Sequence, residues 1–166
     1  LWNRPLFVLL FALPVLLSKY AIITLMPAVS IITNYALYKA ARLQNIRNAY
    51  LVIPFLTFQA FYFPISFSAL AEPLAACIMA MGLLFHIKKK YLAFVIVGSL
   101  LPLARLELSP LLVFWLIILI QQKHWKIIPL LIVPTLLWNF AGTYFSGDPI
   151  WLLSQIFGQG DTVNRY

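Results

Sequence analysis

Residues 91–120 read YLAFVIVGSLLPLARLELSPLLVFWLIILI, and this stretch decides the topology of the chain. Its 30 residues are apolar except near the centre, where Arg105 and Glu107 lie. One continuous helix of that length would measure about 45 Å, whereas the hydrocarbon core of a bilayer is only about 30 Å thick. Pro102 and Pro110 bracket the charged centre, and proline disfavours a helical residue before it. We therefore predict two short antiparallel helices with a tight hairpin at residues 105–110.

The composition of the whole chain predicts an integral membrane protein. Of its 166 residues, 63% are hydrophobic and 10% are charged, whereas soluble domains average about 45–50% apolar and about 25% charged residues. That excess is too large for one anchor on a soluble domain. The net charge of +8 does not indicate nucleic-acid binding, because the Lys and Arg residues punctuate apolar runs. The single cysteine, Cys77, excludes an internal disulfide and a cysteine metal cluster.

The charged residues divide the sequence into apolar runs, which predict an all-α, polytopic bundle of transmembrane helices forming one domain over residues 1–166. A helical span needs about 20 apolar residues, with a range of about 17–25. The first run, residues 6–17, is short and contains Pro14, so we expect an interfacial helix there. Residues 146–166 predict a loop with one short amphipathic segment at residues 150–157. The six predicted spans are residues 21–38, 49–71, 73–87, 91–104, 108–120 and 127–145.

With these spans, the charges separate onto two sides of the membrane. The loops on one side carry eight cations and no acids, whereas all four acids lie on the other side with Arg4, Lys19, Arg105 and Arg165. The positive-inside rule makes the first side cytoplasmic, and we expect a multi-pass protein of the bacterial inner membrane. The eight cations are Lys39, Arg42, Arg47, Lys88, Lys89, Lys90, Lys123 and Lys126. The four acids are Glu72, Glu107, Asp148 and Asp161.

Chemistry is expected on the outer side, where the acids lie beside prolines or helix ends. Glu72 precedes Pro73 and has two interpretations: a carboxylate that stabilises a helix start, or one at the rim of an outward cavity that positions a hydroxyl or holds a cation. The short runs around Arg105 place its turn below the membrane surface. A charge at that depth either faces a water-filled cavity or snorkels outward. A direct helical pair between Arg105 and Glu107 is disfavoured, because helical residues two apart do not face each other.

An aromatic, proline-broken stretch covers residues 54–67. It is typical of an interfacial belt that also packs the helices. Alternatively, Phe58, Gln59 and Tyr62 line a groove for an isoprenoid chain, with Gln59 facing a polar cavity. His86 and His124 have no second ligand at metal spacing, so we predict no metal site in the chain.

The order and sidedness of several short motifs resemble the membrane module of the glycosyltransferase-C superfamily. Members use polyprenyl-phosphate sugars as donors, and they include protein mannosyltransferases and lipid A aminoarabinose transferases. The resemblance covers most of the chain. Its motifs are Asn3-Arg4-Pro5-Leu6, Tyr38-Lys39-Ala40-Ala41-Arg42, Ala71-Glu72-Pro73-Leu74, Leu103-Ala104-Arg105-Leu106-Glu107, Leu136-Leu137-Trp138-Asn139 and Phe145-Ser146-Gly147-Asp148-Pro149.

The resemblance implies sugar transfer at the outer face of the membrane. Glu72 matches an acidic-proline position that lines the catalytic cavity, and it is our candidate catalytic carboxylate. Arg105 matches a basic position where the phosphate of the lipid donor binds. The family's Arg-Pro-Glu form reads Arg105-Leu106-Glu107 here. Glu107, Lys19 and Asp148 complete the candidate substrate- and phosphate-binding set.

The resemblance also implies a principal catalytic carboxylate in a first outer loop, which would end about where Leu1 begins. We therefore expect a piece of a longer protein. A phosphate leaving group needs no acid to protonate it, so a cation such as Arg105 or Lys19, or a divalent metal, could stabilise its charge. The bilayer and a polyprenyl-phosphate sugar are the expected partners.

Two further interpretations stay open. Kinked helices around a buried Arg and Glu would also suit a half of a transporter or flippase-like permease, although no inverted repeat is visible. The chain could instead be a non-catalytic subunit that packs against other membrane proteins in a larger complex.

Overall fold

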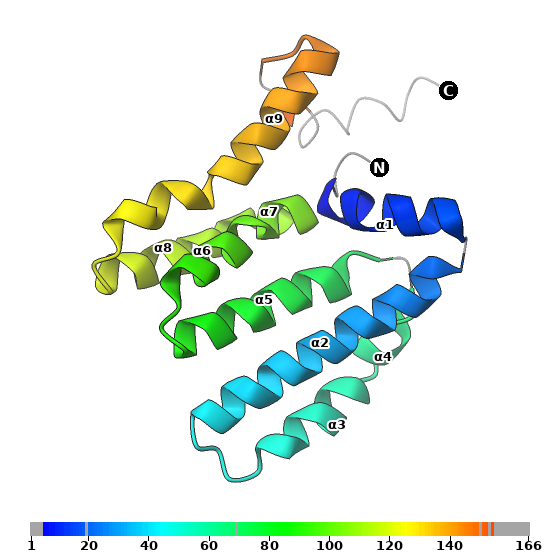
Figure 1. Cartoon of the computed structure of the whole chain (residues 1–166), viewed down its shortest axis with the longest axis vertical. Helices are drawn as coiled ribbons and strands as arrows, with labels where there is room; N and C mark the ends of the chain where they lie inside the picture. Colours follow the sequence, from blue (N-terminus) through cyan, green and yellow to red (C-terminus); the bar gives the residue numbers. More distant parts are fainter. Residues whose placement is uncertain (1–4, 19, 69, 150, 153, 155–166) are drawn as a thin grey trace.

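The computed structural model describes residues 5–18, 20–68, 70–149, 151, 152 and 154 (Figure 1). Over these residues the chain is entirely helical apart from its turns, which confirms the all-α prediction. The α-helices (α) and 3₁₀ helices (η) are α1 (Pro5–Leu17), α2 (Ala21–Leu43), η1 (Ala49–Leu51), α3 (Val52–Thr57), α4 (Tyr62–Ile65), α5 (Glu72–Ile87), α6 (Tyr91–Ser99), α7 (Leu101–Ala104), η2 (Leu106–Leu111), α8 (Leu112–Gln121), η3 (Trp125–Leu131) and α9 (Val133–Ser146).

The hairpin predicted at residues 105–110 is confirmed. Arg105 has extended backbone angles, φ −151° and ψ 113°, between α7 and η2, so the helical path breaks there and reverses. The two arms lie against each other: the Trp115 ring stacks on Phe94 at 5.3 Å, and Trp115 Nε1 donates a hydrogen bond to the Phe94 carbonyl at 3.2 Å. Gly82 and Gly98 make room for the indole, since a Cβ on either would lie 2.6 Å or 2.4 Å from it.

The single span predicted for residues 49–71 is wrong. The stretch is broken into η1, α3 and α4, and a turn at residues 58–61 separates the last two. Pro54 and Pro64 lie within these short helices, and each removes one backbone donor and constrains the preceding turn. α3 packs back along α2 (Figure 1), where Asn34 Nδ2 donates to Thr57 Oγ1 at 3.3 Å.

Most of the predicted spans form helices that are shorter than an ordinary crossing requires, although α2 has 23 residues. In the part of the chain that the structure describes, one helical stretch, the 22 residues Trp125–Ser146, is both long and apolar enough to span a bilayer. Pro5–Leu17, Glu72–Ile87, Tyr91–Ala104 and Leu106–Gln121 are apolar helices of 10–17 residues. The predicted positions of these helices are therefore confirmed. The last three were predicted as full spans, and they are shorter than an ordinary crossing requires.

Two cores hold the helices together. α2 and α5 run side by side (Figure 1), and the small side chains Ala36, Ala40 and Ala80 are buried between them. Small residues allow helix backbones to approach closely, as in membrane bundles. The larger core joins α5, α6, α7 and α8, and its most buried members include Phe94 and Leu119.

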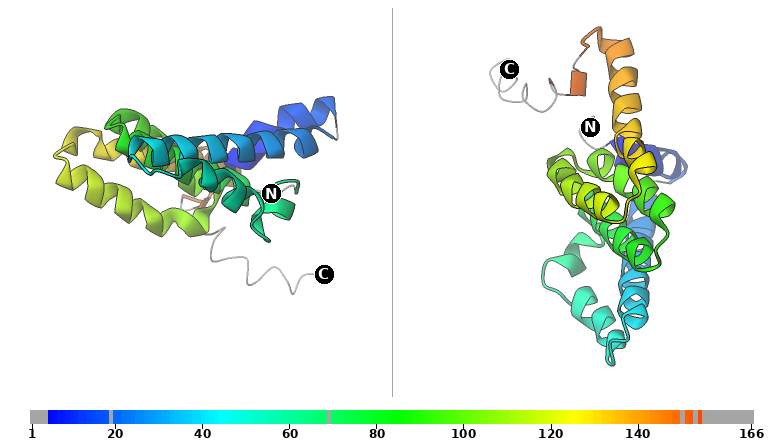
Figure 2. Two further views of the ribbon diagram at one scale, coloured as in Figure 1. Left: turned by 90° about the horizontal axis from the view of Figure 1, so that it is seen from below. Right: turned by 90° about the vertical axis from the view of Figure 1, so that its left-hand side faces the viewer.

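The ends of the helices separate the charges as the sequence predicts. The α2–η1, α5–α6 and α8–η3 turns gather at one end of the helices. The eight cations lie in these turns, in the last part of α2 and at the start of η3. Glu72 is the first residue of α5, and Arg105 directly follows α7. Both lie at the opposite end of the helices. α9 projects away from the other helices (Figure 2).

Candidate functional site

Arg105 and Glu72 form an ion pair, although 33 positions separate them in the sequence. Arg105 Nη1 donates to Glu72 Oε1 at 2.7 Å, and the side chains are 26% and 32% exposed. Glu72 is the first residue of α5, with Pro73 behind it, so the positive end of the helix dipole also stabilises its carboxylate. Arg105 reaches it from the extended link between α7 and η2. The structure thus brings two separately predicted site residues together.

Glu107 is the third member of this cluster. Its Oε2 lies 3.5 Å from Arg105 Nε, and its side chain is 67% exposed. The contact does not contradict the rule that helical residues two apart face different ways, because Arg105 is extended rather than helical. At 3.5 Å the contact exceeds the usual 2.7–2.9 Å of a charged hydrogen bond. The Nε edge of the guanidinium is therefore weakly occupied.

The cluster retains hydrogen-bonding capacity. Arg105 Nε and Glu72 Oε2 are both buried and make no hydrogen bond. One cation lies between two carboxylates, so the cluster has a formal charge of about −1 when all three groups are ionised. Chemically, the guanidinium can bind an anion such as phosphate, and the second oxygen of Glu72 can accept from a hydroxyl or contact a cation.

The cavity beside the cluster is small. It is lined by Leu103 and Leu106, which lie on either side of Arg105 in the sequence, and by Pro5, Thr135 and Trp138. Its volume is about 10 Å³. That is room for about one water molecule. Thr135 Oγ1 is buried there without a hydrogen-bond partner. A donor phosphate would therefore have to approach Arg105 from the exposed Glu107 side.

Asp148 belongs to a separate network at the end of α9. Ser154 Oγ donates to its carboxylate, and its own backbone N–H donates to Ser146 Oγ at 3.2 Å. Gly147 ends the helix with a left-handed φ of 74°. Asn139 stabilises the turn that follows the helix with two hydrogen bonds. Its Nδ2 donates to the Pro149 carbonyl at 3.2 Å, and its Oδ1 accepts from Leu152 N–H at 2.9 Å. Asn139 was not among the predicted site residues, although it follows Trp138 in a motif of the resemblance.

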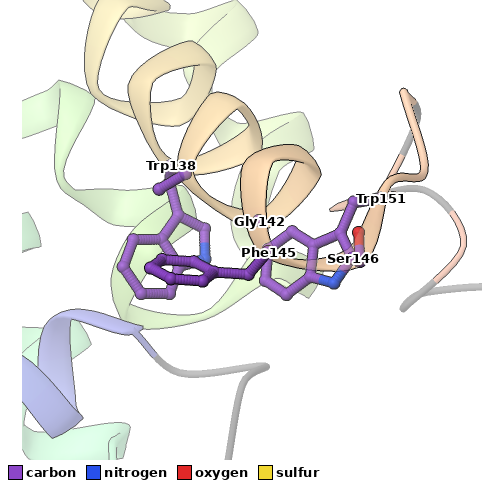
Figure 3. A pocket seen from close by; sticks show the side chains of 6 residues that line it. Trp138, Gly142, Phe145, Ser146 and Trp151 are labelled. Atoms are coloured by element: carbon purple, nitrogen blue, oxygen red, sulfur yellow. The ribbon is translucent and has the colours of Figure 1, made fainter.

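An aromatic pocket that the sequence analysis missed lies beside this network (Figure 3). Its volume is about 290 Å³, and Trp138, Phe145 and Trp151 supply most of its wall. Trp138 and Trp151 are 6.1 Å apart in an edge-to-face arrangement. Gly142 permits the packing, because a Cβ there would lie 1.9 Å from the Trp151 ring. The sequence signal that could have revealed this pocket was the four-residue spacing of Trp138 and Gly142, which places both on one helix face.

The predicted lipid-groove residues do not share one surface. Phe58 is 77% exposed and Gln59 is exposed, both in the turn after α3, whereas Tyr62 is buried in α4. Phe58 stacks on Phe63 at 6.4 Å. Lys19 and residues 150, 153 and 155–157 of the predicted amphipathic segment lie outside the described residues.

No group of three or more His, Cys, Asp or Glu side chains that could hold a metal ion occurs among the residues placed by the structure. Comparison of the chain with protein-family models, with curated proteins and with solved structures gave no significant match.

Proposed function

We propose that this chain is a membrane-embedded glycosyltransferase, or part of one, that moves a sugar from a polyprenyl-phosphate donor to an acceptor at the outer face. The observation that carries the proposal is the Arg105–Glu72 pair, at the helix ends opposite the basic turns. A guanidinium and a carboxylate with unused hydrogen-bonding atoms are suited to a phosphate leaving group and a hydroxyl acceptor.

The exposed surface supports a membrane environment. Large aromatic side chains with exposed fractions between 72% and 85% lie on α3, α9 and the turn between α3 and α4. Soluble monomers rarely expose large contiguous apolar patches. We infer a multi-pass arrangement in which short, proline-broken helices are shielded by neighbouring protein as well as by lipid. These exposed aromatic residues are Phe55, Phe58, Phe61, Phe140, Tyr144 and Phe145.

Each residue of the cluster has a part in the proposed reaction. The bond from the sugar carbon to the phosphate oxygen breaks, the bond from the acceptor oxygen to that carbon forms, and the acceptor proton passes to a carboxylate base, for which Glu72 is the candidate in this chain. Arg105 stabilises the charge left on the phosphate. Glu72 Oε2 orients the acceptor hydroxyl or a divalent cation. Glu107, held weakly at the Nε edge, gives way to a phosphate oxygen.

Binding of undecaprenyl phosphate, compared with undecaprenol, tests the phosphate assignment without an acceptor. Native mass spectrometry of the purified chain in detergent would count the bound lipids. We expect the wild type to prefer the phosphate, and Arg105→Gln to weaken its binding about tenfold or more, since hydrogen bonds to charged groups contribute about 1.5–3 kcal/mol. Lys123→Gln removes the same charge at the opposite end and should change binding little. Equal binding of the two lipids by the wild type would refute the proposal.

A non-catalytic membrane subunit is the second candidate. The observations that favour it are the closed Arg105–Glu72 pair and the cavity of about 10 Å³ beside it. In that case the pair serves to join α5 to the α6–α8 hairpin. In such a protein Arg105→Gln would not weaken binding of the phosphorylated lipid.

A further inference from the structure

A groove at the basic end of the helices is separate from the Arg105 cluster. Its volume is about 410 Å³, within the range of about 300–1,000 Å³ typical of ligand pockets. Its floor is apolar and comes from the last turns of α2 and α5 and from the start of α3. We call it the basic-end groove, and its apolar lining includes Leu37, Ala40, Ala41, Val52, Leu83 and Ile87.

Cations flank this groove along the chain. Arg42 follows Ala41 of the lining, Arg47 follows Ile46, and Lys88 follows Ile87. All three side chains are exposed. Arg42 contacts Tyr38, with Nη1 3.4 Å from the phenol oxygen, and this contact uses one of the five guanidinium donors.

In the part of the chain that the structure describes, no carboxylate forms an ion pair with these cations. Among the residues that the structure describes, the ion pairs within 4.0 Å are those of Arg105 with Glu72 and Glu107, at the other end of the helices. His86 also lines the groove, and its Nδ1 is buried without a hydrogen-bond partner. The groove therefore combines an apolar floor and an unsatisfied polar atom in its wall, and three cations directly follow its lining residues in the sequence.

Helix ends explain part of this arrangement. α2 and α5 both end here, with Arg42 in the last turn of α2 and Lys88 directly after α5, and cations stabilise the carbonyl ends of helices. That role accounts for the positive charge, but it does not require an open apolar groove between the same helices. An amphiphile with an acyl chain and an anionic headgroup would use both features together.

We propose that the basic-end groove binds an anionic phospholipid of the inner leaflet. One acyl chain lies along the apolar floor between α2, α3 and α5, and the phosphate contacts Arg42 and Arg47. A zwitterionic phospholipid offers the same acyl chain without net negative charge, so charge complementarity selects the anionic lipid. The proposal does not depend on the glycosyltransferase assignment, because it concerns the opposite end of the helices.

Native mass spectrometry with dioleoyl-phosphatidylglycerol and dioleoyl-phosphatidylcholine tests the proposal on the purified chain in neutral detergent. We expect one phosphatidylglycerol to be retained at concentrations where phosphatidylcholine is lost. The variant Arg42→Gln/Arg47→Gln should weaken phosphatidylglycerol binding about thirtyfold, at about 1 kcal/mol for each basic residue. The matched control, Lys123→Gln/Lys126→Gln, removes the same charge from the α8–η3 turn and the start of η3, and it should leave that affinity within about twofold.

A second variant tests the groove itself. Leu83 is 46% exposed and lines the groove from α5, so Leu83→Trp should fill the floor and lower the affinity for both lipids without burying a charge. If this variant fails to fold, the arginine pair, which lies on exposed positions, still decides the question. Inorganic phosphate should not compete with the lipid at equal concentration.

Three results would overturn the proposal. Equal retention of phosphatidylglycerol and phosphatidylcholine would indicate that the groove instead binds an apolar helix of another protein. An equal loss in the Lys123 and Lys126 control would indicate diffuse surface charge. Competition by inorganic phosphate would indicate an anion site that has no acyl groove.

Discussion

Arg105 Nη1 lies 2.7 Å from Glu72 Oε1, and this contact ties the turn of the α6–α8 hairpin to the first residue of α5. The backbone is extended at Arg105, between α7 and η2, and from there the guanidinium contacts both Glu72 and Glu107. The pair thus has a structural effect that can be separated from any role in binding phosphate.

Exchange of the two charges separates these roles. Glu72→Gln should cost about 1 kcal/mol of stability, because the pair is partly exposed and such ion pairs are weak. The double variant Glu72→Arg/Arg105→Glu should recover part of that stability, since the opposite charges still meet. It should not recover binding of undecaprenyl phosphate, because the guanidinium is then attached to α5 rather than to the link between α7 and η2. Thermal unfolding in detergent and native mass spectrometry provide the two measurements.

Recovery of both properties by the exchange would contradict the assignment of Arg105 as the phosphate-binding residue. Arg105→Lys gives a further comparison, because lysine keeps the charge but lacks the planar fork that matches phosphate. We expect it to retain more stability than Arg105→Gln while still binding the phosphorylated lipid more weakly than the wild type.

The packing of Trp115 gives a prediction about the hairpin itself. Gly98→Ala places a Cβ 2.4 Å from Trp115 Nε1, so it should destabilise the protein by about 1–3 kcal/mol, the usual cost of overpacking. In a Trp115→Phe background the ring is smaller, and the same substitution should cost clearly less. A double-mutant cycle from thermal unfolding measures this coupling. Additive effects would show that Gly98 and Trp115 do not constrain each other.

The sequence could predict this hairpin because two quantities decided it, the length of the apolar stretch and the thickness of the hydrocarbon core of a bilayer. A 30-residue apolar stretch with Arg105 and Glu107 near its centre is too long for one crossing, and the structure breaks it at Arg105. The same reasoning from length failed for residues 49–71, since it counted apolar residues and gave Pro54 and Pro64 too little weight. These prolines accompany the break into short helices, so Phe58, Gln59 and Tyr62 do not share a helix face.

Contacts between distant segments were beyond reach of the sequence. Sidedness placed Glu72 and Arg105 on the same side of the membrane, but no spacing rule could pair residues 33 positions apart. The packing of Trp151 on Gly142 depends on the turn that Asn139 holds after α9. A side-chain amide that satisfies two backbone groups leaves no periodic signal in a sequence.

Asn139 is expected to hold that turn in place. Asn139→Ala removes the hydrogen bonds to Pro149 and Leu152, and Trp151 should then leave the surface of α9. Cleavage by chymotrypsin after Trp151 should become several-fold faster, while the stability of the α6–α8 hairpin should stay unchanged. Asn139→Asp is the matched comparison, because it keeps the acceptor for Leu152 N–H but loses the donor to Pro149. An unchanged cleavage rate in Asn139→Ala would show that the ring contacts alone hold Trp151.

The sidedness of the charges predicts a labelling pattern in intact cells. In a Cys77→Ser background, single cysteines at Lys88 and Lys123 should be protected from a membrane-impermeant maleimide, because both turns belong to the predicted cytoplasmic end. Cysteines at Ser109 and Ser146 should react, since they lie at the hairpin turn and at the far end of the 22-residue stretch Trp125–Ser146. Permeabilised cells control for accessibility and should allow all four to react. Protection of Ser109 together with reaction of Ser146 would mean that α6 and α8 form a re-entrant hairpin rather than two crossings, and Arg105 would then lie on the cytoplasmic side or within the bilayer.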